Sequence, residues 1–181
     1  MNNFWNERYA FNEYAYGTNP NLFFKEQLDK LKPGKILFAA EGEGRNAVYA
    51  AKNGWNVSAF DASTEAQNKA NKLAGQNHVS IDYRANDLEH ITYQQEKFDA
   101  IVLIFAHFHP RKRESYHKKL ISFLKPGGTV ILESFSKNQI NYKSGGPRNV
   151  EMLYSEEELK SDFGELAEIY IKKNRNYSRR R

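Results

Sequence analysis

The chain has 181 residues, a net charge of +5 and no cysteine. This length suffices for one domain with a single sizeable core. The missing thiol excludes disulfides, thiolate metal sites and cysteine nucleophiles, and it agrees with a reducing cytoplasm. The first residues carry charges without an apolar stretch, and no apolar run approaches about 18 residues. We therefore expect neither a signal peptide nor a membrane span.

The positive charge is concentrated at the C-terminus. The last ten residues hold six basic side chains: Lys172, Lys173, Arg175, Arg179, Arg180 and Arg181. Without them the remainder of the chain is nearly neutral. The basicity belongs to a tail, and it does not predict a nucleic-acid surface on the body of the domain.

The predicted elements alternate between helices and strands. An aromatic-rich N-terminal segment leads to a turn and a helix after Pro20, with Asn19 as its expected N-cap. Five strands are expected at residues 35–40, 55–61, 79–87, 97–108 and 127–136, and a sixth candidate lies at 166–173. Further helices are expected at 45–53, 63–74, 111–124 and 155–163. The last has Ser155 as N-cap and Glu158 placed for a capping box.

This alternation predicts an α/β fold, a Rossmann-like, doubly wound and mainly parallel sheet with helices on both faces. We expect one domain over residues 1–181. It would comprise an N-terminal cap segment at 1–32, a Rossmann-like core at 33–170 and a basic tail at 171–181. Ligands of such sheets bind beyond the carboxyl ends of the strands, at the point where the strand order reverses.

The loop after the first strand reads "AAEGEGRN", residues 39–46. Glycines there let a ligand approach the backbone, and the following helix directs free N–H groups toward it. A dinucleotide loop needs a third glycine, where this chain has Ala47, and the carboxylates of Glu41 and Glu43 would repel a pyrophosphate. A cationic ligand fits better. The alternative is an ordinary tight turn. The candidate contacts are Ala40, Glu41, Gly42, Glu43, Gly44, Arg45 and Asn46.

The ends of the second and third strands add further polar groups. Asp61 lies twenty residues beyond Glu41, the spacing of an acid that accepts hydrogen bonds from ribose hydroxyls. The alternative for Asp61 is a helix N-cap. After the third strand, an aspartate can accept from an adenine amine while a backbone N–H meets a ring nitrogen. With the flanking positions, the candidates are Asp61, Ala62, Ser63, Asn86, Asp87 and Leu88. An amine, a ribose and an adenine together describe S-adenosylmethionine.

Several motifs also resemble one family. They are "FAAEGEGRN", "WNERYAFNEYAYGTNPNLFF", "FDAIVLIFAHFHP", "LKPGGTVILESFS" and "GGPRNVEMLYSEEEL". Over about residues 4–170 the chain is similar to class I S-adenosylmethionine-dependent methyltransferases of the tellurite-resistance and thiopurine-methyltransferase-like branch. Phe38 and Ala40 depart from the usual acidic and glycine positions of the loop, so the resemblance implies that Glu41 contacts the ligand amine. It implies in-line methyl transfer without a catalytic triad.

The resemblance also implies a cap and an acceptor side. The N-terminal aromatics would cover the cofactor through Tyr16 and Gly17, with Tyr9 and Trp5 nearby; alternatively they only pack on the sheet edge. Phe105 and Ala106 would line the methionine arm. His107 and His109 are the candidates to face the acceptor, the alternative being a structural loop histidine. No third ligand accompanies this pair, so no metal site is expected. Tyr142 and Arg148 are the candidates to bind a small anionic acceptor.

The C-terminus departs from the family pattern, because a β-like sequence changes abruptly to "KKNRNYSRRR". We hypothesise a frameshift, which resequencing the gene would test. Three alternatives accompany the small-molecule methyltransferase: a cofactor-binding but inactive relic, an RNA or protein methyltransferase that uses the basic tail, and a nicotinamide oxidoreductase. Tellurite, selenite, thiols and thiopurines are all acceptors that the resemblance permits. A cytoplasmic monomer or homodimer is expected.

Overall fold

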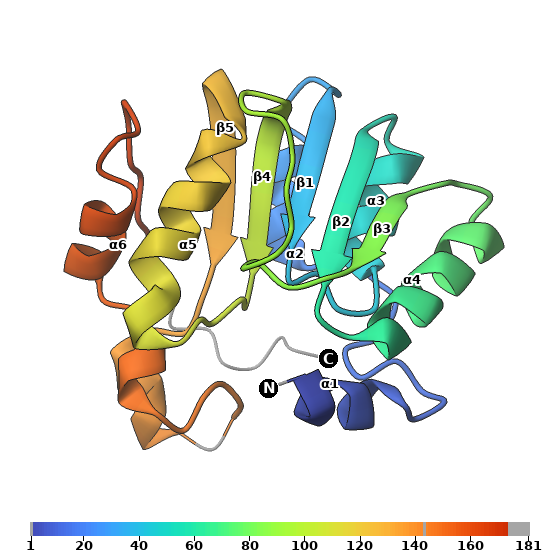
Figure 1. The fold of residues 1–181 in the computed structure, drawn as a ribbon, viewed down its shortest axis with the longest axis horizontal. Coiled ribbons are helices and arrows are strands. Elements are labelled where there is room, and N and C mark those ends of the chain that lie inside the picture. The colour runs from blue at the N-terminus through green and yellow to red at the C-terminus, as the bar shows by residue number, and fades with distance from the viewer. Residues whose placement is uncertain (1, 143, 174–181) are drawn as a thin grey trace. The chain divides into compact units, whose positions relative to one another are not determined.

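The computed structural model describes residues 2–142 and 144–173. Its strands are β1 Lys35–Ala39, β2 Asn56–Asp61, β3 Asp82–Ala85, β4 Phe98–Ile104 and β5 Leu124–Glu133 (Figure 1). Its α-helices are α1 Asn2–Tyr9, α2 Leu22–Leu28, α3 Arg45–Lys52, α4 Thr64–Gln76, α5 Pro110–Ser122 and α6 Glu156–Asp162. Two 3₁₀ turns, η1 Lys137–Asn141 and η2 Val150–Met152, follow β5.

All strand pairs are parallel, and the strand order is β3-β2-β1-β4-β5. The chain moves outward from β1 to β3 and then returns to the other side of β1 for β4. The order therefore reverses between β1 and β4, whose carboxyl ends form the switch point of the sheet. This parallel sheet with flanking helices confirms the predicted fold class.

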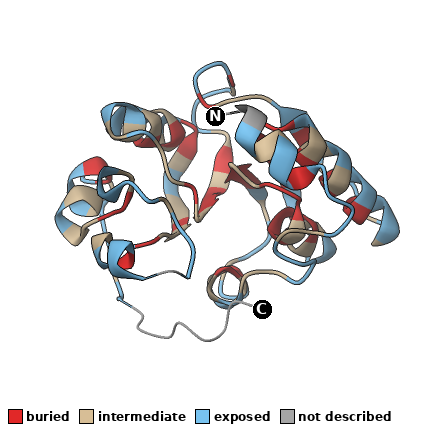
Figure 2. Ribbon diagram, turned by 90° about the horizontal axis from the view of Figure 1, so that it is seen from below, coloured by how far each residue is buried: buried red, intermediate tan, exposed pale blue. Residues whose placement is uncertain are grey.

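The apolar runs of the strands are buried on both faces, as a parallel sheet requires. Figure 2 shows the buried positions concentrated along the strands. One face packs against α2, α3 and α4 through side chains that include Phe24 of α2, Ala47 of α3 and Phe38 of β1. Leu37 and Ile101 point to the opposite face and are equally buried. The sheet thus holds the loops at its carboxyl ends on a rigid base.

The chain forms two compact units. The first contains residues 1–106 and 123–133, and hence the whole sheet with α1 to α4. The second contains residues 107–122 and the chain from 134 onward, and hence α5, α6 and both 3₁₀ turns.

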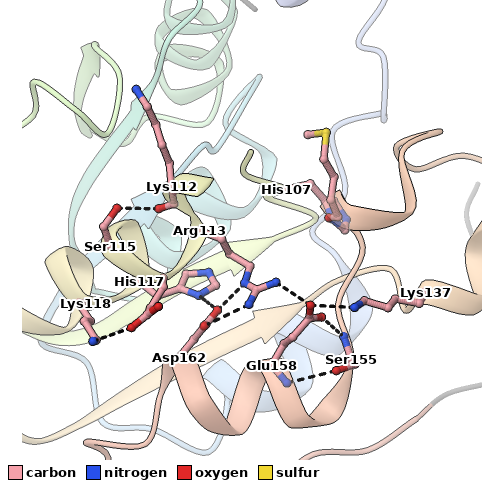
Figure 3. Close-up of polar contacts among 12 residues, drawn as sticks. His107, Lys112, Arg113, Ser115, His117, Lys118, Lys137, Ser155, Glu158 and Asp162 are labelled. Carbon is pink, nitrogen blue, oxygen red and sulfur yellow. Dashed lines mark hydrogen bonds and ion pairs between the residues drawn. The ribbon is translucent and has the colours of Figure 1, made fainter. Parts of the chain in front are cut away.

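Charged side chains link α5 to α6 inside the second unit (Figure 3). Arg113 binds Asp162 through Nε at 2.7 Å and Glu158 through a terminal nitrogen at 3.1 Å. Glu158 also accepts from Lys137 at 2.7 Å. The buried His117 ring adds a contact of 2.8 Å to Asp162. Each carboxylate of this cluster therefore has a cationic partner.

Three local predictions are wrong. Asn21, not Asn19, caps α2, because its side chain accepts from the Phe24 N–H. The helix expected to continue to residue 124 ends at Ser122, since Leu124 pairs with Phe98 of β4. Residues 166–173 form no strand, although their sequence alternates; Tyr170 there is 89% exposed. Alternation alone provides no partner strand, so that signal was insufficient.

The capping box of α6 is confirmed, with the Ser155 and Glu158 side chains each bonded to the other's backbone N–H. No helix within the described ranges is long and apolar enough to cross a membrane. The frameshift hypothesis depends mainly on residues 174–181, which lie outside the described residues.

Candidate functional site

The loop between β1 and α3 contains three residues with left-handed backbone. Ala40, Gly42 and Gly44 have φ angles of 52°, 66° and 88°. A Cβ added to Gly42 would lie 2.8 Å from the Tyr9 hydroxyl, and one on Gly44 would lie 2.6 Å from the Cβ of Ala70. Glycine is thus needed at both positions for close approach as well as for backbone conformation.

Glu41 lies at the beginning of α3. Its Oε1 accepts from the backbone N–H groups of Asn46 at 3.0 Å and Ala47 at 2.8 Å. Gly44, the N-cap residue, has no side chain for this purpose. Desolvation raises the pKa of the Glu41 carboxyl to about 7, although those N–H groups and the charge of Arg45 act to lower it. A nearby cationic ligand would favour its ionised form.

Asp61 joins the ends of β1 and β2. Oδ2 accepts from the Gly42 N–H and Oδ1 from the Ser63 N–H, both at 3.0 Å, and the residue is 8% exposed. Burial raises its pKa against the effect of these donors. The N-cap of α4 is Ser63, whose hydroxyl accepts from the Ala66 N–H at 3.2 Å. The N-cap alternative for Asp61 is therefore wrong. Ala62, between them, is half-buried.

Two tyrosines lie close to these carboxyl groups. Tyr83 donates its hydroxyl to the Gly42 carbonyl at 2.5 Å. Tyr9 is buried and stacks on Trp5 with ring centroids 5.5 Å apart. Burial, together with the Asp61 charge, raises the pKa of both phenols well above its usual value. Both tyrosines therefore remain neutral hydroxyl groups near the loop.

The second acid of the loop faces protein groups. Glu43 accepts from the Ala15 N–H at 2.7 Å and from the Lys69 ammonium at 2.8 Å. Arg45 donates to the Tyr16 carbonyl at 2.9 Å. The Tyr16 side chain itself is 50% exposed. The N-terminal segment is consequently bound to the loop through its backbone.

The segment after β3 reaches the same end of the sheet. Asn86 donates its N–H to the Asp61 carbonyl at 2.9 Å. Asp87 accepts from the His90 N–H at 3.0 Å and contacts the His90 ring at 2.7 Å. Despite some burial, His90 lowers the pKa of the Asp87 carboxyl. Leu88 is buried. Backbone bonding therefore holds this segment beside β2.

Two further candidates lie at the end of β4, and one at the start of α3. Phe105 has a φ of 55°, and its N–H donates to the Glu133 carbonyl at 2.7 Å. Ala106 is buried. The buried Asn46 side chain accepts from the Asn21 N–H at 2.8 Å, so it anchors the start of α2.

His107 and His109 belong to the second unit. The Met152 carbonyl lies 2.8 Å from Nδ1 of His107, and the Phe135 N–H lies 3.3 Å from its Nε2. A carbonyl only accepts and an N–H only donates, so these neighbours specify a neutral Nδ1–H ring. The structural alternative describes His107 well. His109 is exposed, and its Nδ1 faces the Arg111 N–H at 3.3 Å.

Tyr142 and Arg148 are adjacent, since the Arg148 guanidinium donates to the Tyr142 carbonyl at 2.9 Å. The Tyr142 side chain is 44% exposed. Over residues 2–142 and 144–173, no three His, Asp or Glu side chains are grouped so that they could hold a metal ion.

A family model described as a methyltransferase domain matches residues 36–128, slightly more than half of the chain. The chain belongs to the methyltransferase domain family. The class I, S-adenosylmethionine-dependent assignment and its cofactor are confirmed at this family level.

The methyltransferase domain has curated relatives and solved neighbours. A ubiquinone biosynthesis O-methyltransferase of Coxiella burnetii (strain Dugway 5J108-111) is 28% identical over 121 residues, which are 66% of this chain and 52% of that protein. A structure reported for conversion of a disulfide bond into a thioacetal group during echinomycin biosynthesis is 19% identical, with a TM-score of 0.74, over 90% of this chain and 77% of that one. The DhpI–SAH complex is 25% identical, with a TM-score of 0.50, over 60% and 52% of the two chains.

This chain thus spans about half the length of the curated relatives it matches. Sequence reasoning missed two residues of the methyltransferase domain that contact the loop: Tyr83 and Lys69. Tyr83 had a usable signal, because it occupies the inward position in a short alternating strand. Lys69 had none, because lysines on the outer faces of helices are common.

Proposed function

We propose that this protein transfers a methyl group from S-adenosylmethionine to a small-molecule acceptor. The observation that carries the proposal is the pair of carboxyl groups at the switch point. Glu41 and Asp61 are held by backbone N–H groups, and within the described residues neither forms an ion pair. Anionic groups kept desolvated in this way favour a ligand that brings positive charge and hydroxyl donors.

The residues fit such a cofactor in a specific order. We assign Glu41 to the methionine amine and Asp61 to the ribose hydroxyls. The segment 86–88 is assigned to the adenine, and Phe105 with Ala106 to the methionine arm. We further propose that residues 1–32 act as a cap segment of a single domain, with Tyr16 and Gly17 over the cofactor.

The bound cofactor supplies an activated methyl group on a sulfonium. The chain's own residues then need only bind both reactants, align them and exclude water. The neutral Tyr9 and Tyr83 phenols and the backbone-bonded His107 ring supply no strong base. This supports an acceptor that is nucleophilic without prior loss of a proton of high pKa.

Two acceptor classes follow from different observations. The N-terminal and "GGPRNVEMLYS" motifs support the tellurite-resistance and thiopurine-like branch, and hence a chalcogen oxyanion or a thiol. The named relatives are ubiquinone biosynthesis O-methyltransferases, which supports a phenolic oxygen as the second candidate. We favour the first class, since a thiolate at neutral pH needs less help from a base than a phenol does.

Calorimetric titration with S-adenosylmethionine and S-adenosyl-L-homocysteine tests the cofactor. We expect micromolar binding by the wild type and strong weakening by Asp61→Ala. An acceptor panel of tellurite, selenite, thiols, thiopurines and catechols would follow. Binding without turnover on any of them would favour the inactive relic, and methyl transfer to RNA or protein alone would remove the small-molecule proposal. A cytoplasmic location and a monomeric or dimeric state stay predictions.

A further inference from the structure

Glu43 lies only two residues from Glu41, yet its surroundings differ. It is 5% exposed, and its two oxygens contact groups from distant parts of the chain. Oε2 accepts from the Ala15 N–H at 2.7 Å, and Oε1 contacts the Lys69 ammonium at 2.8 Å. A carboxylate already paired in this way offers little negative charge to a ligand.

Lys69 of α4 extends this contact. Its ammonium also donates to the Glu13 carbonyl at 2.7 Å and lies 5.3 Å from the centre of the Tyr14 ring. The Tyr14 hydroxyl donates to the Lys69 carbonyl at 3.2 Å. The Lys69 side chain is 14% exposed. One ammonium therefore joins the loop acid to two consecutive residues of the N-terminal segment.

Two further hydrogen bonds order the same segment, one from the loop and one within the segment. Arg45 donates to the Tyr16 carbonyl at 2.9 Å. Gly17 donates to the Tyr14 carbonyl at 3.2 Å and has a φ of 68°, which favours glycine. Residues 13–17 are thus fixed by polar contacts to the loop and to α4.

Among the large side chains of this part of the segment, only the partly buried Tyr14 packs against a buried apolar cluster, which α3 and α4 supply. The Phe11 side chain is 69% exposed and that of Tyr16 is 50% exposed. Segments with few buried apolar contacts open locally at low free-energy cost unless specific bonds hold them. Removing one member of a buried ion pair leaves the other uncompensated, so the Glu43–Lys69 pair has a large influence on whether residues 13–17 stay closed.

We propose that Glu43 and Lys69 are positioning residues. Together they hold residues 13–17 against the loop, and they set the affinity for the cofactor without touching it. This inference rests on the proposed function, because Tyr16 and Gly17 are the residues assigned to the cofactor. It changes the expected role of Glu43 from a ligand contact to a support.

The test uses the full chain with Glu43→Ala, Lys69→Met and the double variant. Lys72→Met is the matched control, because Lys72 is an exposed lysine of the same helix. Calorimetry measures the dissociation constant for S-adenosyl-L-homocysteine. NMR hydrogen exchange of the Ala15 amide measures segment closure, and exchange of the Ile36 and Val57 amides of β1 and β2 reports the core.

We expect each single variant to weaken binding by about tenfold and to speed Ala15 exchange by at least about tenfold, with core exchange unchanged. The double variant should lose about as much cofactor affinity as one single variant does, because either substitution already breaks the Glu43–Lys69 pair. Lys69→Arg should recover most of the affinity, since it retains the cation. Lys72→Met should match the wild type.

Weaker binding with unchanged Ala15 exchange would overturn the inference and make Glu43 a direct ligand contact. Faster Ala15 exchange with unchanged affinity would overturn the positioning role as well. If either single variant also loses protection of the core amides, the dissociation constants of Lys69→Arg and Lys69→Met are compared. Equal values would show that the charge of Lys69 is not needed and would overturn the inference. If the wild type binds neither form of the cofactor, the proposed function fails by itself, whereas the Ala15 exchange still reports on the Glu43–Lys69 contact.

Discussion

Two acids at the switch point of the first unit and an acid of the second unit have opposite pKa shifts. In the first unit, Glu41 and Asp61 accept from backbone N–H groups and form no ion pair within the described residues, and burial raises the pKa of both although Arg45 acts to lower that of Glu41. In the second unit, Glu158 is also partly buried, yet Lys137, the Ser155 N–H and Arg113 lower its pKa to about 2. The carboxyl pKa is therefore raised at Glu41 and Asp61 and lowered at Glu158.

The difference separates the proposed binding groups from structural ones. A carboxylate paired with Arg113 and Lys137 has its charge compensated inside the protein, so it stabilises the fold and has little left for a ligand. A buried carboxyl group that forms no ion pair has a desolvation cost that a cationic or hydroxyl-rich ligand would offset. Glu43 resembles the second unit in this respect, because Lys69 compensates it.

The largest effect is expected for Asp61→Asn. An amide nitrogen would face either the Gly42 or the Ser63 N–H, and the acceptor for ribose hydroxyls would lose its charge. Losing two charge-assisted hydrogen bonds of about 1.5–3 kcal/mol each predicts at least a 100-fold weaker affinity for S-adenosylmethionine. Asp82→Asn, at an exposed acid of β3, is the control and should bind as the wild type does. Equal affinities in calorimetry would remove Asp61 from the site.

Glu41→Gln should weaken cofactor binding and raise the stability of the ligand-free protein. The pKa of Glu41 is about 7 in the folded chain and 4.5 as a reference, so the unfolded chain ionises first and stability is lost as the pH rises from about 4.5 to about 7. Below about pH 4.5 the acid is protonated in both states, and the variant should match the wild type there. Thermal unfolding at pH 8 should show a gain of up to about 3 kcal/mol for the variant, because the pKa shift of Glu41 converts at about 1.4 kcal/mol per unit.

The pH dependence of cofactor binding provides a second test of Glu41. Wild-type affinity should fall as the pH decreases below about 7, and Glu41→Gln should bind about 10- to 100-fold more weakly with a flatter pH dependence. A variant that is less stable than the wild type at pH 8 would contradict the burial argument. If the affinities of the wild type and Glu41→Gln changed in the same way with pH, Glu41 would not contact the cofactor amine.

Glu158→Gln tests the paired carboxylate and should change stability without changing cofactor affinity. Its lowered pKa means that its contribution is present above pH 4.5 and is lost as the pH falls toward about 2. Because the Glu158 side chain is 26% exposed, we expect a loss of only about 1 kcal/mol at pH 7. Glu165→Gln, at an exposed acid beyond α6, should leave stability unchanged. Denaturant unfolding at pH 7 and pH 3 measures both.

The smallest effect concerns His117. Burial lowers its pKa, while Asp162 acts to raise it and Arg113 to lower it; the Phe163 ring stacks on it at 4.6 Å. A lowered pKa means that the neutral ring supports folding above its ordinary value of about 6.5, and that this support is lost as the pH falls. The NMR resonances of His117 should titrate below the ordinary histidine value of about 6.5. A higher midpoint for His117 would show that Asp162 outweighs burial.

Local sequence signals predicted most of the fold. Apolar runs separated by helical periodicity specified all five strands, and the Ser155 and Glu158 spacing specified a capping box that forms as expected. These predictions succeeded because periodicity and capping act between residues that are close in sequence. The expected strand at 166–173 failed because a strand also needs a neighbour, which local alternation does not supply.

The sequence by itself also predicted the loop at residues 40–46 and Asp61 as ligand contacts, which stay predictions; the structure joins the two through the Gly42–Asp61 hydrogen bond. The loop pattern alone made Glu41 and Glu43 equal candidates, and only the family resemblance singled out Glu41 for the ligand amine. Their environments depend on Ala15 and Lys69, which are 28 and 26 residues from Glu43 in the chain. Only tertiary packing brings those groups to one carboxylate and leaves the other to backbone donors, because desolvation and charge pairing are properties of the folded neighbourhood.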